Sequence, residues 1–402
     1  MARDRFETWR KRGSTLGQRR LADIIRRLIY QHDESLFDRL EFPDDSQFLH
    51  PLLFAFFTDP SPYIEVSQIL YGLMRSARRP ASVRIQTDAA GRASLGPFGN
   101  IETGLPCTTV DFGRNGDGLT YGCFSGTAPV PFGFCSPLIV PGTQIEVTTD
   151  ISPLFYRFFD QPLGLLAGAE TLRVSRERVS HLLVALALIQ THCPSVWAEI
   201  RTFIRMIVLY RAAAPNSFAA KSAHGALFCN IAENDDEIAL LEDVAHQAAH
   251  VIFNAFSHEP MRVIAIDPET PMQGLCGDAE DLRSINAAFH AQFTYTLISR
   301  VLTRIHDAGV LPERQSHELL ARFGLILRKF EFDLTRLALP DAYTLAGRRC
   351  REAFTAEYQY LRARYGALVD GFAYDNQPYT FDYARFVERN GGSWQVVREM
   401  AS

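Results

Sequence analysis

The sequence has few cysteines, no large excess of charge and no long apolar run, and each absence excludes a class of protein. Its seven cysteines are odd in number, lie far apart and include no Cys-x-x-Cys pair. This pattern is typical of reduced thiols in a cytosolic protein and not of a disulfide framework. No run reaches the ~18 consecutive apolar residues that a membrane span needs, and no apolar segment follows the charged N-terminus as in a secretory signal. We therefore expect a cytoplasmic protein with no membrane partner.

The charge balance is not that of a nucleic-acid-binding protein. The 41 lysines and arginines are outnumbered by 46 acidic residues, so the formal net charge is -5. Proteins that bind nucleic acid are usually strongly basic, so we expect no nucleic-acid partner. Residues 1–30 are a local exception, with nine basic and three acidic side chains. Their pattern favours the solvated face of an amphipathic helix, and the alternative is a docking surface for an acidic peptide.

Changes in composition predict three consecutive regions in a mainly helical α+β protein. Residues 1–80 form an N-terminal helical region, because apolar residues recur there at helical spacing. Residues 81–150 are rich in Gly, Pro and Thr, and β-favouring runs at 82–87 and 144–149 predict short strands between loops. Residues 151–402 are helical again, and we expect this region to bind a metal and to carry the catalytic site.

Capping residues and apolar periodicity predict the helices of the third region. We expect Ser175 and Pro194 to begin two of them, and Asp235 or Asp236 to begin the helix that carries His246. A short apolar segment between turn residues, Ala223–Ile231, predicts a strand. The helices that begin at Ser175 and Pro194 are expected to cover residues 175–191 and 194–210. Further helices are expected at 282–308, 313–338 and 341–365.

The segment 241–256, LEDVAHQAAHVIFNAF, carries the main functional signal. On a helix His246 and His250 share a face, which is the geometry of a metal-binding HExxH segment. Chance alone would produce roughly 0.3 such pairs from the chain's histidines, so the motif depends on its context. An apolar stripe beside the histidines would anchor the helix in the core and hold both imidazoles at the edge of a cavity. The stripe comprises Ile238, Leu241, Ala245, Ala248, Ile252 and Phe256.

Two histidines hold a metal poorly, so a third ligand is expected from another element. His290 is the best candidate, because it lies in a predicted helix with Arg283 seven residues before it. Seven residues make about two turns, which would place the guanidinium and the imidazole on one face roughly 10 Å apart. Arg283 could then bind the far carboxylate of a small diacid whose near end chelates the metal. The acidic alternatives for a third ligand are Asp267, Glu269, Asp278, Glu280 and Asp281.

Gln247 stands where a zinc protease of this type has its glutamate base. An amide cannot accept the proton, and loss of a general base costs on the order of 10²–10⁴ in rate, so hydrolysis of the zinc-protease kind is disfavoured. An iron centre that activates dioxygen needs histidines and open coordination positions, but no glutamate at this place. We expect Gln247 to orient a ligand or a water by hydrogen bonding.

Residues 151–366 resemble the 2-oxoglutarate-dependent HExxH-type peptide β-hydroxylases, which are found near ribosomally made, modified peptides in bacteria. The resemblance includes His246-Gln-Ala-Ala-His250 in the HExxH place and the small-residue segment 217–226 before it. Residues 283–290, RSINAAFH, resemble the family's Arg-Pro-Leu-x-Gly-x-x-His pattern, and residues 343–349, YTLAGRR, resemble its Leu-Thr-x-x-Gly-Arg segment. Gln247 and Ser284 depart from the family's Glu and Pro.

The resemblance implies hydroxylation of a side-chain β-carbon in a peptide substrate, with Fe(II), 2-oxoglutarate and dioxygen. It implies that His246, His250 and His290 bind the metal and that Arg283 binds the distal carboxylate of 2-oxoglutarate. Two other classes stay open: a zinc-dependent hydrolase with an altered base, and a non-catalytic peptide-binding protein on the same scaffold. We expect His224, on the predicted strand, to be buried and hydrogen-bonded, and His258 and Glu259 to lie in a loop after the helix.

Overall fold

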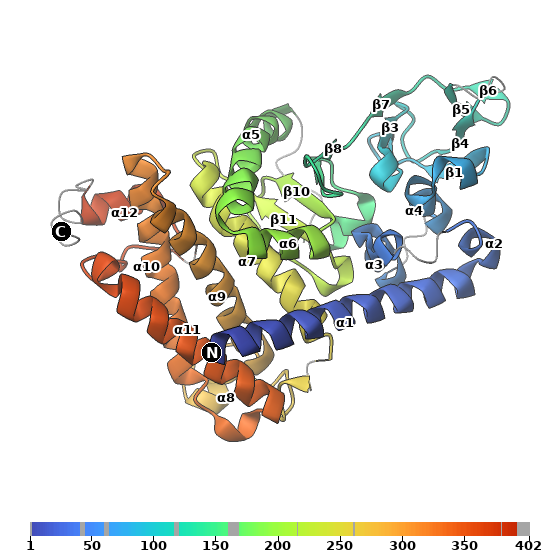
Figure 1. The fold of residues 1–402 in the computed structure, drawn as a ribbon. Helices are drawn as coiled ribbons and strands as arrows, with labels where there is room; N and C mark the ends of the chain where they lie inside the picture. Colours follow the sequence, from blue (N-terminus) through green and yellow to red (C-terminus); the bar gives the residue numbers. More distant parts are fainter. Residues whose placement is uncertain are drawn as a thin grey trace. The chain divides into compact units, whose positions relative to one another are not determined.

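The chain folds into a mainly helical α+β structure, as predicted (Figure 1). The computed structural model describes residues 2–40, 45–59, 64–115, 120–159, 169–214, 216–259, 262–378 and 380–391. It divides into two compact units whose segments alternate along the sequence, and the predicted boundaries at 80 and 150 do not coincide with them. The helical unit comprises residues 1–17, 180–200 and 234–402, and the sheet unit comprises residues 18–179 and 201–233.

Three small sheets form the β structure of the sheet unit. Two are antiparallel and are built from the region that was predicted to contain strands and loops, and the third has parallel strands at its centre. The first has the order β1 (Ser82–Gln86), β4 (Thr109–Arg114), β5 (Tyr121–Ser125) and β6 (Ala128–Pro129). The second has the order β2 (Arg92–Ser94), β3 (Asn100–Glu102) and β7 (Gly133–Cys135). The third has the order β11 (Ala226–Asn230), β10 (Met206–Tyr210), β9 (Glu146–Thr148) and β8 (Leu138–Ile139).

The central strand β10 corrects a predicted helix. Residues 206–210 were expected to continue the helix that begins at Pro194, but that helix, α6 (Pro194–Phe203), ends before them. All five side chains of β10 are buried, and the strand pairs in parallel with β9 and β11. A short apolar run that is buried on every side fits a central parallel strand as well as it fits a helix, so periodicity could not separate the two. The predicted strand at 223–231 is confirmed as β11.

The helices of the sheet unit pack against the third sheet through an apolar cluster that includes Phe48, Leu53, Val208 and Phe228. The ranges of its helical elements are α2 (Glu34–Phe37), η1 (Asp45–Leu49), α3 (Pro51–Thr58), α4 (Val66–Leu73), η2 (Ser76–Arg78), η3 (Gly96–Phe98), η4 (Pro153–Phe158) and η6 (Lys221–Ala223). Helix α3 begins with His50 as its N-cap, followed by proline at the first position, where the missing N–H costs no hydrogen bond.

Two long helices contribute residues to both units. Helix α1 (Ala2–His32) contains the basic segment, and its Arg12, Arg19 and Arg27 are exposed, as expected for a solvated face. Helix α5 (Ala169–His192) begins before Ser175, so the prediction that Ser175 begins this helix is wrong. A serine that precedes an apolar periodic run can also lie inside a helix whose first turns are less apolar.

The helical unit is built around α9 (Ile285–Ala308), which packs against the three longest helices that share the unit with it. These are α7 (Glu237–Phe256), α10 (Glu313–Arg336) and α11 (Leu345–Val369). Two short helices complete the unit, α8 (Met272–Cys276) and α12 (Tyr383–Asn390). The short 3₁₀ helix η8 (Pro340–Ala342) precedes α11. No helix in the described ranges is both long and apolar enough to cross a membrane.

Side-chain caps determine where the long helices begin. Asp236 caps α7 as predicted, Ser284 caps α9 and Thr344 caps α11. Each side-chain oxygen accepts a backbone N–H of the first turn that has no partner within its helix. Gly347 is required in the first turn of α11, because a Cβ atom there would overlap the carbonyl oxygen of Val263. Residues 343–349, which resemble the family's Leu-Thr-x-x-Gly-Arg segment, therefore pack closely against the backbone at Val263.

A buried ionic network ties α1 to three other helices of the helical unit. Arg10 is 1% exposed and donates to both carboxylate oxygens of Glu199, at 2.7 and 2.9 Å, and to Glu7 at 2.9 Å. Arg300 donates to Glu7 and to both oxygens of Glu357, at 3.1 and 2.9 Å. Such a network is destabilising if it is left incomplete, because each remaining charge is then buried without its partner.

Candidate metal centre

Helix α7 holds its two histidines on a rigid base. Asp236 accepts the N–H of Ile238 at 2.8 Å and so defines the first turn. The predicted apolar stripe is fully buried, with Leu241, Ala248 and Phe256 all at 0% exposure. His246 and His250 lie on the neighbouring face and are only half-buried. The helix is therefore anchored through one face and keeps both imidazoles accessible on the next.

The structure brings the three predicted histidines together. The ring centroids of His246 and His250 are 4.9 Å apart, and those of His250 and His290 are 4.7 Å apart. Two imidazoles that bind one ion at about 2.1 Å have centroids about 4.6–5.3 Å apart for bond angles near 90–110°. Phe253 packs against the His290 ring, with centroids 4.7 Å apart, and closes one side of the cluster. The spacing of the rings therefore suits a shared ion.

The three histidines do not form a complete metal site in this structure. Among the described residues, no group of three or more His, Cys, Asp and Glu side chains is arranged to hold a metal ion. Ring rotation about the side-chain bonds is needed to direct three nitrogens to one position. Metal binding by the three histidines stays a prediction.

The protonation state of the cluster favours metal binding. Burial, with smaller electrostatic effects of Lys329 and His290, lowers the pKa of His246 to about 4. Burial and the neighbouring His246 lower the pKa of His250 to about 3. At neutral pH both imidazoles are uncharged, which is the form that binds a metal. No proton has to be displaced from either ring.

Gln247 points back along its own helix. Its side chain is buried, and its Nε2 donates to Oδ1 of Asp243 at 3.2 Å, one turn earlier. Its Oε1 has no hydrogen-bond partner within the described part of the chain, although the atom is buried. A buried acceptor without a donor is costly and marks a position where a ligand or a water would be stabilised. The expected orienting role for Gln247 stays a prediction, and Oε1 is the atom that would perform it.

Arg283 does not lie on α9, so the predicted two-turn relation to His290 is wrong. Ser284 is the N-cap of α9, with its hydroxyl accepting the N–H of Ala287 at 3.2 Å, and Arg283 precedes it. Four of the five guanidinium N–H groups are used by two carboxylates. Asp281 accepts at 2.9 and 2.8 Å, and Asp333 accepts at 3.0 and 2.7 Å. Bidentate binding of another carboxylate by Arg283 would require one of these pairs to open.

Lys329 is a cation near the histidines that the sequence reasoning missed. It lies on α10, seven residues after Arg322 and four before Asp333, so the three side chains share one face. Arg322 bonds Glu242 of α7 at 2.8 Å, and Asp333 bonds Arg283. Burial lowers the pKa of Lys329, while Glu242 and Asp333 act to raise it. The sequence signal that could have identified Lys329 is the spacing of Arg322, Lys329 and Asp333, which places three charged side chains on one face of the helix.

Among the acidic alternatives for a third ligand, Asp267, Asp278 and Asp281 have carboxylates that are engaged elsewhere, and Glu269 and Glu280 are exposed. Asp281 bonds Arg283, and Asp278 forms an ion pair with Arg336. Asp267 accepts the N–H of Glu269 in a turn, and Glu280 donates its N–H to Asp278 in another. His290 is therefore the better candidate among them.

Two further histidines behave as expected. His224 is 2% exposed, and its Nε2 lies 2.6 Å from Oε1 of Gln18 in the sheet unit. Burial, with a smaller effect of Arg205, lowers the pKa of His224 to about 3. His258 follows the end of α7, where it lies 3.5 Å from the carboxylate of Glu259. Both predictions are confirmed.

Comparison with known proteins adds no assignment to this geometry. No family model matches the chain, and no curated protein matches it.

Proposed function

We propose that this protein is an iron- and 2-oxoglutarate-dependent oxygenase that hydroxylates a side-chain β-carbon of a ribosomally made peptide in the cytoplasm. The observation that supports the proposal is the cluster of His246, His250 and His290, in which the ring of His250 lies 4.9 Å from that of His246 and 4.7 Å from that of His290. Two of the rings are uncharged and half-buried, as ligands of an open site must be.

In this proposal the three histidines hold Fe(II), which with 2-oxoglutarate supplies the oxidising power for C–H hydroxylation by dioxygen. The protein's own part is to position the ligands and to limit water. The apolar face of α7 and the ring of Phe253 provide a dry support for the histidines. Oε1 of Gln247 is a buried acceptor that can hold a water or a protonated group in place. The Gln247 amide cannot act as a general base, which argues against the hydrolase alternative.

Lys329 is the better cation for the distal carboxylate of 2-oxoglutarate. Arg283 is committed to Asp281 and Asp333, whereas the charge of Lys329 acts directly on His246. An ammonium group binds a carboxylate as a point charge and needs no planar two-point geometry. A half-buried cation close to the metal ligands would attract the dianionic cosubstrate and would also be stabilised by it.

The decisive test is metal and turnover analysis of protein that is purified without oxygen. We expect Fe(II) to bind, and succinate to form when 2-oxoglutarate, dioxygen and a candidate peptide are present. His290→Ala should lose both properties, since a site with only two protein ligands holds its metal poorly. The matched control is His306→Gln, a change of a half-buried histidine on the same helix, and it should keep both.

Two results would contradict the proposal. Zinc in the protein together with peptide cleavage would support the hydrolase class, and the absence of bound metal would support the non-catalytic class. Equal iron binding by wild type and His290→Ala would show that the third ligand lies elsewhere.

A further inference from the structure

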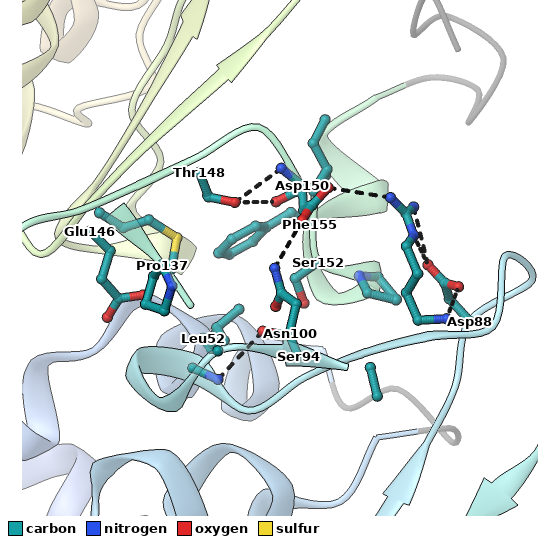
Figure 2. Close-up of a pocket in the computed structure, with 17 residues that line it drawn as sticks. Leu52, Asp88, Ser94, Asn100, Pro137, Glu146, Thr148, Asp150, Ser152 and Phe155 are labelled. Atoms are coloured by element: carbon teal, nitrogen blue, oxygen red, sulfur yellow. Dashed lines mark hydrogen bonds and ion pairs between the residues drawn. The ribbon is translucent and has the colours of Figure 1, made fainter. Parts of the chain in front are cut away.

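The sheet unit contains a cavity that the proposed function does not use. Its volume is about 40 Å³, which is room for about three water molecules. Figure 2 shows the polar groups around it, with Glu146 on β9, Asn100 on β3, and Asp150 and Ser152 on the segment after β9. Phe155 and Leu52 contribute apolar surface to the same lining. The cavity therefore combines acceptor atoms with an apolar wall.

A buried His–Glu pair stands at one side of the cavity. Nε2 of His50 lies 3.1 Å from Oε1 of Glu146, and the two side chains are 3% and 6% exposed. Nδ1 of His50 accepts the N–H of Leu52 at 3.4 Å as the cap of α3, so this nitrogen carries no proton. The imidazole proton must then be on Nε2, where it is donated to Glu146. Nε2 of the His50 imidazole consequently donates to the Glu146 carboxylate.

The guanidinium of Arg92 and the amide of Asn100, two donor groups of the lining, bond carboxylates. Arg92 donates to Asp88 at 3.3 Å and to Asp150 at 3.4 Å, and Nδ2 of Asn100 donates to Asp150 at 3.0 Å. Within the described residues, no protein hydrogen bond is made to the second carboxylate oxygen of Glu146 or to Oδ1 of Asn100. The lining therefore offers acceptor oxygens of Glu146 and Asn100 to a ligand that brings donors.

The charges around the cavity select a cation. Three carboxyl groups, those of Asp88, Glu146 and Asp150, line the cavity together with one guanidinium, that of Arg92, so acidic groups outnumber basic ones there. We infer that this cavity binds a primary ammonium group on a short alkyl stem. Glu146 is its charged acceptor, Oδ1 of Asn100 is a neutral one, and the stem lies against Leu52 and the ring of Phe155, where aromatic surface also attracts a cation.

A metal ion fits the lining less well than an organic cation. A divalent cation needs several oxygen ligands that converge on one point. No three acidic, histidine or cysteine side chains of the described segments converge in that way. The apolar part of the lining would also give a hydrated ion nothing to bind. An ammonium group needs only two or three acceptors and gains from apolar contact with its stem.

The test is calorimetric titration of the full chain with n-propylammonium chloride. Sodium propionate is the matched anion of similar size, and tetramethylammonium is a cation without N–H donors. We expect only propylammonium to bind. Glu146→Gln should weaken binding about 10–100-fold, as expected for loss of a charge-assisted hydrogen bond. Glu102→Gln is the matched control, since it removes an exposed carboxylate from β3 of the same unit and should leave the affinity unchanged.

A second probe, Nα-acetyl-lysinamide, distinguishes two sources of the same chemistry. Tighter binding than that of propylammonium would identify a lysine side chain of a peptide as the ligand, and weaker binding would identify a free small amine. Failure of wild type to bind propylammonium, equal binding of propionate, or unchanged affinity in a folded Glu146→Gln variant would overturn the inference. If Glu146→Gln does not fold, the preference of wild type for propylammonium over the other two salts decides the question.

Discussion

Replacing Glu7 by glutamine tests the ionic network that joins α1 to the rest of the helical unit. Glu7 bonds both Arg10 and Arg300, and its side chain is 20% exposed. The substitution keeps the size of the side chain and removes its charge. Arg10 then keeps only Glu199, and Arg300 keeps only Glu357, so the buried Arg10 and the half-buried Arg300 each lose one of two anionic partners.

The pKa of Glu7 gives the magnitude. Burial acts to raise this pKa, but Arg10 and Arg300 outweigh it and lower the pKa from 4.5 to about 2. A shift of that size corresponds to about 3 kcal/mol of stabilisation of the ionised form in the folded state. We therefore expect Glu7→Gln to lower the free energy of unfolding by about 3 kcal/mol at pH 7, a large part of a typical domain's stability.

The pH dependence follows from the sign of the shift. The folded state binds the Glu7 proton less readily than the unfolded state, so the stabilisation is fully present above pH 4.5. It decreases as the pH falls from 4.5 and is lost near pH 2. Urea unfolding of wild type and Glu7→Gln between pH 7 and pH 3, extrapolated to zero denaturant, should show two curves that converge at low pH.

Glu352→Gln is the control, because Glu352 is exposed on α11 and its charge should contribute little. A difference between wild type and Glu7→Gln that stays constant from pH 7 to pH 3 would refute the electrostatic explanation. So would a loss at pH 7 no larger than that of Glu352→Gln.

Two further predictions concern the candidate metal centre and the thiols. Lys329→Met should weaken 2-oxoglutarate binding about 10–100-fold without loss of iron. The control Arg304→Met removes an exposed cation from α9 and should leave the affinity for 2-oxoglutarate unchanged. Equal effects of the two substitutions would exclude the proposed role of Lys329. Burial raises the pKa of Cys193 to about 11, although Arg304 acts to lower it. Iodoacetamide at pH 8 should therefore alkylate the exposed Cys107 and Cys135 in native protein long before Cys193, as peptide mass mapping would show. Rapid labelling of Cys193 would mean that the thiol is not buried.

Local patterns were sufficient for much of the secondary structure. Apolar spacing and caps predicted α7, α10 and the strand β11, since Asp236 at the start of a periodic run satisfies helix N–H groups wherever the helix packs. The same reasoning failed at β10, because an apolar run of five residues suits a buried strand and a helix equally. The pairing with β9 and β11 decided between them, and those partners are distant in sequence.

The candidate site was predictable in its ligands and not in its surroundings. His246 and His250 share a helix, so spacing alone places them together. Spacing along the chain could not identify Lys329 as the cation near these two histidines. Arg283 was expected to face the metal, but Ser284 starts the helix after it, and Asp333, fifty residues away, binds its guanidinium.

The sequence by itself determined the features that depend on neighbours along the chain: the helix that carries two histidines, its buried stripe and its cap. Only the tertiary structure decided which separate segments meet. It placed His290 beside His250, brought Lys329 close to His246, and put His50 against Glu146 across 96 positions. The physical reason is that helix periodicity is a property of local backbone geometry, whereas contacts between segments depend on how all apolar faces are buried at once.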